Sequence, residues 1–268
     1  MEKNHILCMI DFSEETPALL RYATHLSEAY QAKLWVLHVY FVPSGYQGEI
    51  FIPKEALESY EKQCMKDFSR LKQGDDLKDH EIHFEARHGD IVEEANQLIE
   101  QKKIKLLVVG NRSDSLLVSI LGSNTLKLIY HARCPVLSVP PSVTFQPFRR
   151  ILLATDWEES PRQRVVHIMQ LLSRHEPTMD IIHVAQKQNH AIKEMNTNEF
   201  KIKGVPHTLY CLWENHVEEG LEHHIAEHEN DLIILFPRHH DFFDRLFQQS
   251  ITRQMVFHAK VPLLTIRA

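Results

Sequence analysis

The sequence predicts an α/β protein made of two similar domains, each with helices packed on a parallel sheet. One observation is that short apolar stretches, typical of buried strands, alternate along the chain with segments whose apolar residues recur at helical spacing. Another is an internal repeat, because Asp156 lies 145 residues after Asp11 and His183 lies 145 residues after His38. The length of 268 residues suits two domains of ordinary size.

The first repeat alternates strand and helix signals throughout. The strands are predicted in "HILCMIDF", "AKLWVLHVY", "HEIHFEARHG", "IKLLVVG" and "CPVLSVP". The first helix, "SEETPALLRYATHLSEAY", is expected to be capped by Ser13, and the second to cover 53–72. The third, "DIVEEANQLIEQKK", begins with an acidic residue, and the fourth opens at Gly122 and Ser123 after a polar loop.

The second repeat follows the same order with a shorter middle. "RRILLATDWEESPRQRVVHIMQLLSRH" repeats the first strand and helix, and "MDIIHVA" repeats "LWVLHVY". Leu232 then lies 126 residues after Leu106, and Pro262 lies 127 residues after Pro135. "PPSVTFQPF" is rich in proline and lacks periodicity, so we interpret it as a linker. The expected domains are residues 1–141 and 149–268.

Composition narrows the class of protein. A hydrophobic content of 43% with 25% charged residues is typical of a globular protein, and the apolar runs are too short to cross a bilayer. No signal-peptide pattern is seen, so we expect a cytoplasmic protein. The four cysteines are far apart, which argues against a redox or zinc motif. The net charge of −6, without a basic cluster, argues against nucleic-acid binding.

Several motifs in a fixed order resemble a known family. The order "ILCMIDFSEET", "LWVLHV", "HGDIVEEA", "LLVVG" and "LGSNTLKLIYHARCPVLSV" resembles a universal stress protein domain, and the second half resembles a more divergent one. The resemblance implies two flavodoxin-like domains of the adenine nucleotide alpha hydrolase-like kind. Each would have five parallel strands with helices on both faces. Ligands of such folds bind beyond the carboxyl ends of the strands, at the topological switch point.

The resemblance also implies candidate ligand residues in the first domain. Members that bind ATP carry Gly, two residues, Gly, nine residues, then Gly-Ser or Gly-Thr. Gly110, Gly122 and Ser123 match this motif, whereas Ser113 replaces the second glycine and the loop is one residue short. Arg112 could reach a phosphate or lie in solvent.

The adenosine would lie against Asp11 and Val39. The alternatives are structural: Gly110, Gly122 and Ser123 could simply form a strand end and a helix cap, and Asp11 could cap the helix that follows it. The residues leave both interpretations open.

The corresponding site of the second domain has lost this chemistry. Phe236, His239 and Gln249 stand at the three glycine positions, and only Ser250 is retained. Side chains at these positions would block the close approach of a phosphate to the backbone. We therefore expect that an ATP ligand, where one binds, is held by the first domain only.

Histidines are numerous, and we expect most of them to be structural. His224 and His228 lie four residues apart in a predicted helix, beside His223 and Glu227, and are interpreted as a solvated face rather than a zinc site. The histidines and the aspartate of "PRHHDFFDR" lie in the degenerate phosphate loop, so we attribute them to sequence drift rather than to a metal or acid-base site. His38 and His183 fall on strands and are expected to bind backbone groups. No metal is expected.

The motifs of common enzyme classes are missing from the sequence, including the nucleophile elbow, the His-Glu-x-x-His motif and a lysine-bearing phosphate loop. The expected function is that of a cytoplasmic tandem universal stress protein, a regulatory or stress-response module rather than an enzyme. One alternative is a protein that binds no nucleotide and acts only through protein contacts. The other is a slow nucleotide hydrolase.

The two domains are expected to pack as a pseudo-dimer through their last strands. "CPVLSV" and "VPLLTI" are apolar and should lie at sheet edges, where an uncovered strand is prone to aggregate. The pairing within one chain would replace the dimerisation of single-domain members. A further homodimer would then use another surface, and other protein partners are not identified by the sequence. No membrane contact is expected.

Overall fold

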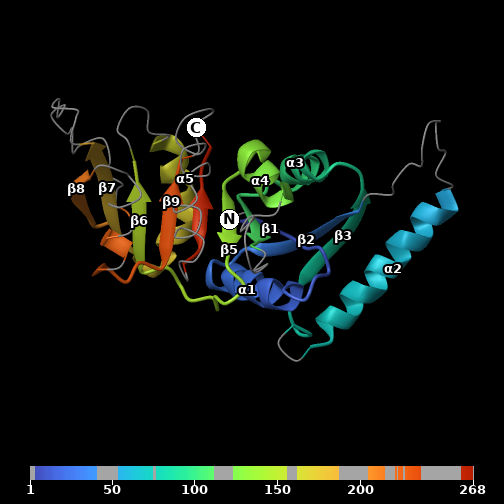
Figure 1. Ribbon diagram of the computed structural model, residues 1–268. Helices are drawn as coiled ribbons and strands as arrows, with labels where there is room; N and C mark the ends of the chain where they lie inside the picture. Colours follow the sequence, from blue (N-terminus) through green and yellow to red (C-terminus); the bar gives the residue numbers. More distant parts are fainter. Residues whose placement is uncertain are drawn as a thin grey trace, which may run out of the picture.

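The computed structural model describes residues 4–40, 54–74, 77–111, 123–155, 162–186, 205–214, 221, 223–225, 227–236 and 261–267. Within these residues, ten strands form one sheet in the order β3-β2-β1-β4-β5-β10-β9-β6-β7-β8 (Figure 1). The strands are β1 His5–Met9, β2 Lys33–Tyr40, β3 Ile82–His88, β4 Leu106–Gly110, β5 Val136–Val139, β6 Arg150–Ala154, β7 Thr178–Gln186, β8 His207–Glu214, β9 Leu232–Leu235 and β10 Leu263–Thr265. We call β1 to β5 the first half of the sheet and β6 to β10 the second half.

Helices cover both faces of the sheet, as the alternating pattern predicts. The helices are α1 Thr16–Ala29, α2 Lys54–Lys72, α3 Ile91–Lys102, α4 Ser123–His131 and α5 Arg162–Leu172, followed by the short 3-10 helix η1 Ser173–His175. In the first half α1 and α2 lie on one face and α3 and α4 on the other (Figure 1). Of these described helices, none is long and apolar enough to span a membrane.

Strands of the sheet centre are buried on both faces. In β1, Ile6 and Cys8 join the core beneath α1, whereas Leu7 and Met9 join the core beneath α3 and α4. Central strands of a parallel sheet that is covered on both faces are apolar on both sides. This explains why their sequences are continuous apolar runs. Burial raises the pKa of the Cys8 thiol to about 12, so Cys8 serves as an apolar residue of this core.

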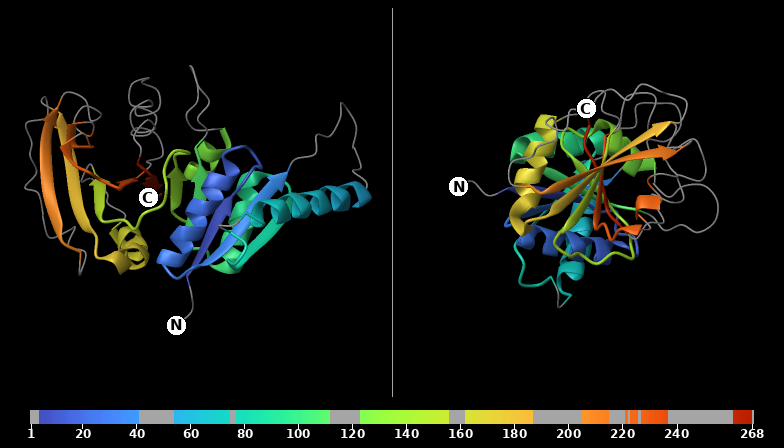
Figure 2. Two further views of the ribbon diagram at one scale, coloured as in Figure 1. Left: turned by 90° about the horizontal axis from the view of Figure 1, so that it is seen from below. Right: turned by 90° about the vertical axis from the view of Figure 1, so that its left-hand side faces the viewer.

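The two halves join through an antiparallel pairing of β5 and β10. Each of the other strand pairs described is parallel. Leu137 faces Leu264, Val136 faces Thr265 and Ser138 faces Leu263. The repeat offset of 127 residues makes Leu137 and Leu264 equivalent, so this pair lies on a pseudo-twofold axis. The predicted pseudo-dimer arrangement of the last strands is therefore confirmed. We call the antiparallel β5–β10 pairing the seam, and Figure 2 shows the two halves on either side of it.

The segment predicted as a linker is packed between the halves. Phe148 is buried, its N–H donates to the hydroxyl of Tyr30 at 3.3 Å, and its ring stacks on the ring of Tyr30 at 6.1 Å between centroids. Phe145 contacts Tyr22 and Tyr30 edge-on. His175 of η1 also approaches the Tyr30 ring and lies 3.1 Å from the Ala29 carbonyl. This aromatic cluster holds the end of α1 against the second half.

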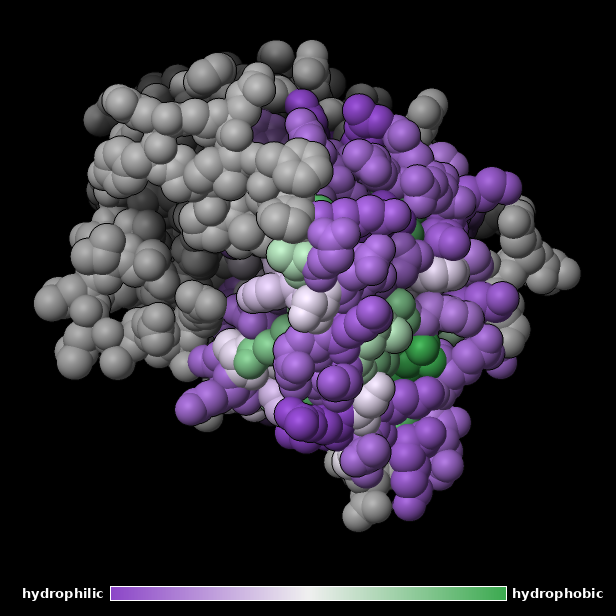
Figure 3. Space-filling model, turned by 90° about the vertical axis from the view of Figure 1, so that its right-hand side faces the viewer, coloured by the Kyte–Doolittle hydropathy of each residue, from purple (hydrophilic) through white to green (hydrophobic). Residues whose placement is uncertain are grey.

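The outer edge at β3 is polar. Arg87 donates to Glu85 at 2.6 Å and approaches Glu94 at 3.5 Å. Figure 3 shows this end of the molecule, which is mostly hydrophilic with a small hydrophobic area. Among the described residues the exposed large hydrophobic side chains are Tyr60 and Met65, both on α2. Charged side chains on an edge strand discourage pairing with another sheet.

Helix starts differ in part from the prediction. Asp90, the acidic residue at which the third helix is predicted to begin, is the N-cap of α3 and accepts from the N–H groups of Val92 and Glu93 at 2.9 and 3.1 Å. The expectation that Ser13 caps the first helix is wrong, because α1 begins at Thr16 and its N-cap is Glu15, whose side chain makes no capping bond. Ser13 instead belongs to a turn described below, in which its N–H donates to Asp11.

The expectation that His224 lies on a solvated face is also wrong. Its side chain is buried, with its Nε2 3.4 Å from a carboxylate oxygen of Asp180, and its ring stacks on that of His228 at 3.9 Å. Asp180 also accepts from Arg150 at 3.1 Å and from Asn230 at 3.2 Å. The helical spacing indicated that His224 and His228 share one face of a helix. It did not indicate that this face packs toward the sheet. Groups of three or more potential metal ligands are not found within the described ranges.

We expect His224 to make stability depend on pH. Burial, and then the nearby His228, lower the pKa of His224, so the unfolded chain takes up a proton near pH 6.5 that the folded chain resists. The free energy of unfolding should therefore fall as pH falls below about 6.5. Urea unfolding should show that the free energy of unfolding falls less between pH 7 and pH 5 for His224→Gln than for the unchanged protein. His25→Gln, at an exposed position of α1, should keep the original loss. Equal losses in all three proteins would contradict the assignment.

The stability of the β5–β10 pairing should depend on the size and charge of Leu137 and Leu264, the pair on the pseudo-twofold axis. Leu264→Ala removes a side chain that is 1% exposed and should lower the free energy of unfolding by about 2–5 kcal/mol. Leu264→Asp should cost more, because it buries a carboxylate beside Leu137. Hydrogen exchange should then rise first in β5 and β10. Tyr60→Asp, on the exposed part of α2, is the control and should leave the exchange of both strands unchanged.

Candidate functional site

A cavity of about 200 Å³ lies at the carboxyl ends of β1, β4 and β5. In the first half the strand order is β3-β2-β1-β4-β5, so the chain reverses its direction of winding between β1 and β4. The cavity is lined by Met9 to Asp11 from the end of β1 and by Val109 to Asn111 from the end of β4. It therefore opens at the topological switch point, where ligands of doubly wound sheets bind.

A tight turn after β1 shapes one wall of the cavity. Phe12 has a φ of 58°, which is uncommon for a residue other than glycine. Its ring packs edge-on against His38 at 4.7 Å between ring centroids. One oxygen of Asp11 accepts from the N–H of Ser13 at 3.0 Å and from the hydroxyl of Thr16 at 3.3 Å. The carboxylate of Asp11 is thus fixed by the turn at the cavity wall.

His38 and His183 support the same strand ends in the two halves. Nδ1 of His38 lies 3.0 Å from the carbonyl of Ile10, and Nδ1 of His183 lies 3.1 Å from the carbonyl of Thr155. These contacts are equivalent, since both residue pairs are separated by the repeat offset of 145. The prediction that the two strand histidines bind backbone groups is confirmed.

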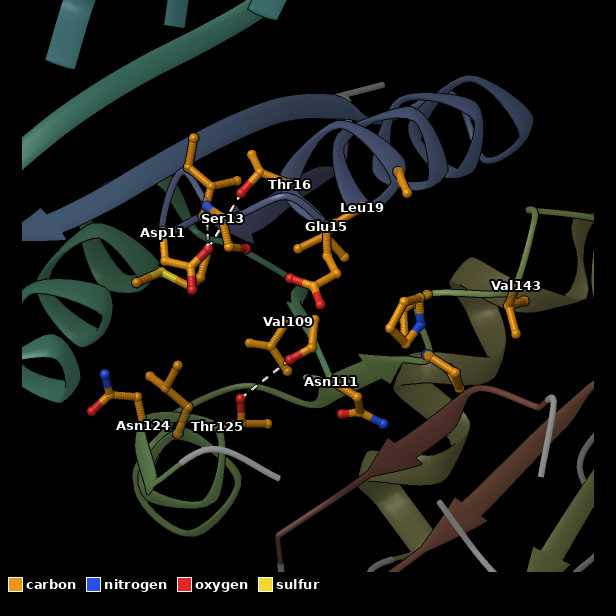
Figure 4. A pocket seen from close by; sticks show the side chains of 18 of the residues that line it. Asp11, Ser13, Glu15, Thr16, Leu19, Val109, Asn111, Asn124, Thr125 and Val143 are labelled. Atoms are coloured by element: carbon orange, nitrogen blue, oxygen red, sulfur yellow. Dashed lines mark hydrogen bonds between the residues drawn. The ribbon is translucent and has the colours of Figure 1, made fainter. Parts of the chain in front are cut away.

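Close packing surrounds the end of β4. A Cβ added at Gly110 would lie 3.2 Å from a terminal methyl of Leu19, so this strand end approaches α1 closely. On the opposite side the hydroxyl of Thr125 donates to the Gly110 carbonyl at 3.3 Å, drawn as a dashed line in Figure 4. The first turn of α4 therefore lies directly against the cavity, where its N–H groups favour anions.

Asn111 occupies the far wall and contacts β5. Its N–H donates to the Val139 carbonyl at 2.9 Å, and its side-chain oxygen accepts from the hydroxyl of Ser138. Asn111 is only 5% exposed and lines the cavity. Pro140, Pro141 and Val143 of the segment between the halves complete this wall.

Polar groups are divided between two sides of the cavity. Figure 4 shows Asp11 and Glu15 on the α1 side. Asn111, Asn124 and Thr125 lie on the side of β4 and α4. The apolar remainder includes Met9, Ile10, Leu19, Val109 and Leu128. An apolar cleft with a few convergent polar groups is the usual form of a small-molecule site.

The structure brings some of the sequence-predicted residues together. Asp11 and Gly110 both line the cavity. Val39 is near the end of β2, where it packs against the core on the α3 side and is not among the lining residues. Ser123 begins α4, but its side chain is not described. Arg112 and Gly122 lie outside the described residues.

The second half differs at the equivalent strand end. Phe236 directly follows β9, at the position corresponding to Gly110, and its side chain is buried in the core on the α5 side. His239, Gln249 and Ser250 lie outside the described residues, as does Asp156.

Sequence reasoning missed Asn111, Thr125 and Glu15. Asn111 stands at one of the two unspecified positions between Gly110 and Ser113 in the family motif, which gives it no role. Its only signal was the position of a polar residue directly after a buried strand. The contact with Ser138 joins residues 27 positions apart, and nothing in either local pattern indicates it.

Comparisons with known proteins agree on one family. The family model described as the universal stress protein family matches residues 3–140. The universal stress protein A homolog 1 of Coxiella burnetii is 28% identical over 145 residues, which cover 52% of this chain and 97% of that protein. The universal stress protein A homolog of Haemophilus influenzae is 30% identical over 138 residues, which cover 51% of this chain and 95% of that protein.

A solved structure extends the comparison to the whole chain. The crystal structure of a universal stress protein from Archaeoglobus fulgidus DSM 4304 superposes with a TM-score of 0.73. The match covers 100% of this chain and 99% of that one. At 16% identity it shows that the two share a fold across both halves.

We expect Gly110 and Leu19 to be coupled energetically. Gly110→Ala places a methyl against Leu19 and should cost about 1–3 kcal/mol of stability. In a double variant with Leu19→Ala, the added methyl no longer meets the Leu19 side chain, so the combined loss should be smaller than the sum by about 1 kcal/mol. Denaturant unfolding of the four proteins measures this term. Gly74→Ala, whose Cβ would meet only an ordinary contact at 3.5 Å, should show no coupling to Leu19→Ala.

Proposed function

Because this chain belongs to the universal stress protein family, we propose that it is a tandem member whose first domain, residues 1–141, binds an adenine nucleotide. Residues 149–268 form a divergent second domain that does not bind nucleotide and serves the assembly of the pair. The whole chain acts as a regulatory module of a stress response rather than as an enzyme.

The observation that carries this proposal is the cavity at the switch point between β1 and β4. Asp11, on its α1 side, can accept hydrogen bonds from ribose hydroxyls or an adenine amine. The start of α4, on the other side, offers backbone N–H groups and the positive end of the helix dipole to phosphate. A nucleotide has donors at one end and an anion at the other, and this matches the division of polar groups across the cavity.

The difference between the halves supports assignment to the first domain. Gly110 lets the backbone at the end of β4 approach a ligand without a side chain in between. Phe236, at the equivalent position after β9, is 8% exposed and places a ring in the core instead. The second domain therefore lacks the glycine on which the family motif depends.

The binding proposal is tested with a matched pair of substitutions. Asp11→Asn keeps the turn acceptor but removes the charge, so it should weaken ATP and AMP binding about tenfold or more in calorimetry. Asp156→Asn changes the equivalent position of the second repeat and should leave affinity unchanged. Equal losses from both substitutions would contradict assignment to the first domain.

Measurement of ATP turnover distinguishes the proposed binding module from a slow nucleotide hydrolase. Phosphate release from ATP by the full chain should not exceed the rate without protein. If release is faster and Asp11→Asn abolishes it, the hydrolase alternative is correct. If the unchanged protein binds neither ATP nor AMP, the alternative that acts only through protein contacts is correct.

A further inference from the structure

The carboxamide of Asn111 has an unused donor in the cavity wall. Its oxygen accepts from Ser138, and its backbone N–H is taken by the Val139 carbonyl. Its side-chain nitrogen donates to none of the described residues, although Asn111 is 95% buried by its 5% exposure. A primary amide carries two donors, and the Asn111 nitrogen is not among the described side-chain atoms that are fully buried without a partner. This donor is therefore available to a ligand in the cavity.

Ser138 determines which end of the carboxamide faces the cavity. Ser138 is completely buried in β5, and its single hydroxyl proton is directed at the Asn111 oxygen. That contact leaves the nitrogen as the group presented to a ligand. Without the hydroxyl, the amide could turn and present its oxygen instead.

The seam shows that this use of Ser138 is specific to the first half. Its equivalent by the 127-residue offset is Thr265, whose hydroxyl donates across the seam to the Val136 carbonyl at 3.2 Å. The same bond from Ser138 would go to the carbonyl of Leu263, its facing residue in β10. Ser138 instead bonds Asn111, so pseudosymmetry is broken at the residue that contacts the cavity wall.

The position of Asn111 identifies the ligand group. It directly follows Gly110, on the side of the cavity that the first turn of α4 approaches, while Asp11 and Glu15 lie on the α1 side (Figure 4). A donor beside a helix N-terminus suits an anionic acceptor. Resting on the proposed function, we propose that Asn111 donates its side-chain N–H to a phosphate oxygen of the nucleotide, and that Ser138 is the residue that positions it.

Calorimetric titration of the full chain with adenosine, AMP and pyrophosphate tests this assignment. Asn111→Asp replaces the donor with a carboxylate and should weaken AMP and pyrophosphate binding about ten- to hundredfold, with adenosine affinity within about twofold. Asn111→Ala removes the donor without adding repulsion, so its loss should be smaller. Thermal unfolding checks that each variant is folded.

Ser138 is tested against its pseudosymmetric mate. Ser138→Ala should weaken AMP binding about three- to tenfold and have little further effect when combined with Asn111→Ala. Thr265→Val removes the matching hydroxyl of β10 and should leave AMP affinity unchanged. If Thr265→Val weakens binding as much as Ser138→Ala, the effect comes from a loosened seam and the positioning role is overturned.

The outcomes distinguish this inference from the proposed function. Asn111→Asp that leaves AMP affinity unchanged, or that weakens adenosine equally, overturns the phosphate contact while adenine nucleotide binding stands. Binding of pyrophosphate that depends on Asn111, with no binding of adenosine or AMP, supports the phosphate contact and overturns the adenine ligand. If the unchanged protein binds none of the three probes and no ATP, both proposals are overturned.

Discussion

The antiparallel pairing of β5 with β10 is the constraint on which the rest of the molecule depends. Each half ends in a short apolar strand, and a half on its own would leave that strand uncovered. Pairing the two edges satisfies their backbone groups and joins two five-stranded sheets into one. Leu137 and Leu264 meet on the pseudo-twofold axis, so neighbouring residues of the two strands are matched by the same register.

The seam is also close to the cavity, and this closeness links assembly to binding. β5 supplies Val139 to the cavity wall, and the segment that leaves it adds Pro140, Pro141 and Val143. The same segment continues into the aromatic cluster of Phe145 and Phe148, which joins α1 to the second half. A ligand in the cavity would therefore contact the stretch of chain that connects the halves, whereas a ligand at the far edge of the sheet would not.

Duplication has left the two halves with different chemistry at equivalent positions. The first half keeps Gly110 at the end of β4 and a cavity beside it, while the second half has Phe236 in its core. The second half instead contains a buried polar cluster around Asp180, which corresponds by the 145-residue offset to Trp35. A buried carboxylate with Arg150, His224 and Asn230 around it requires all its partners, because removal of one would leave an unsatisfied polar group.

The sequence by itself determined the alternation of strands and helices, the duplication and the pairing of the last strands, because each follows from periodicity or from an apolar edge that must be covered. It also indicated Asp11 and Gly110, which the fold brings to one cavity, and the backbone contacts of His38 and His183. Only the tertiary structure decided that His224 is buried against Asp180, that Glu15 rather than Ser13 precedes the first helix, and that Asn111 is held by Ser138. The physical reason is that a local pattern records the geometry of one element, whereas these contacts join side chains from separate elements whose distance is set by how the sheet and its helices pack.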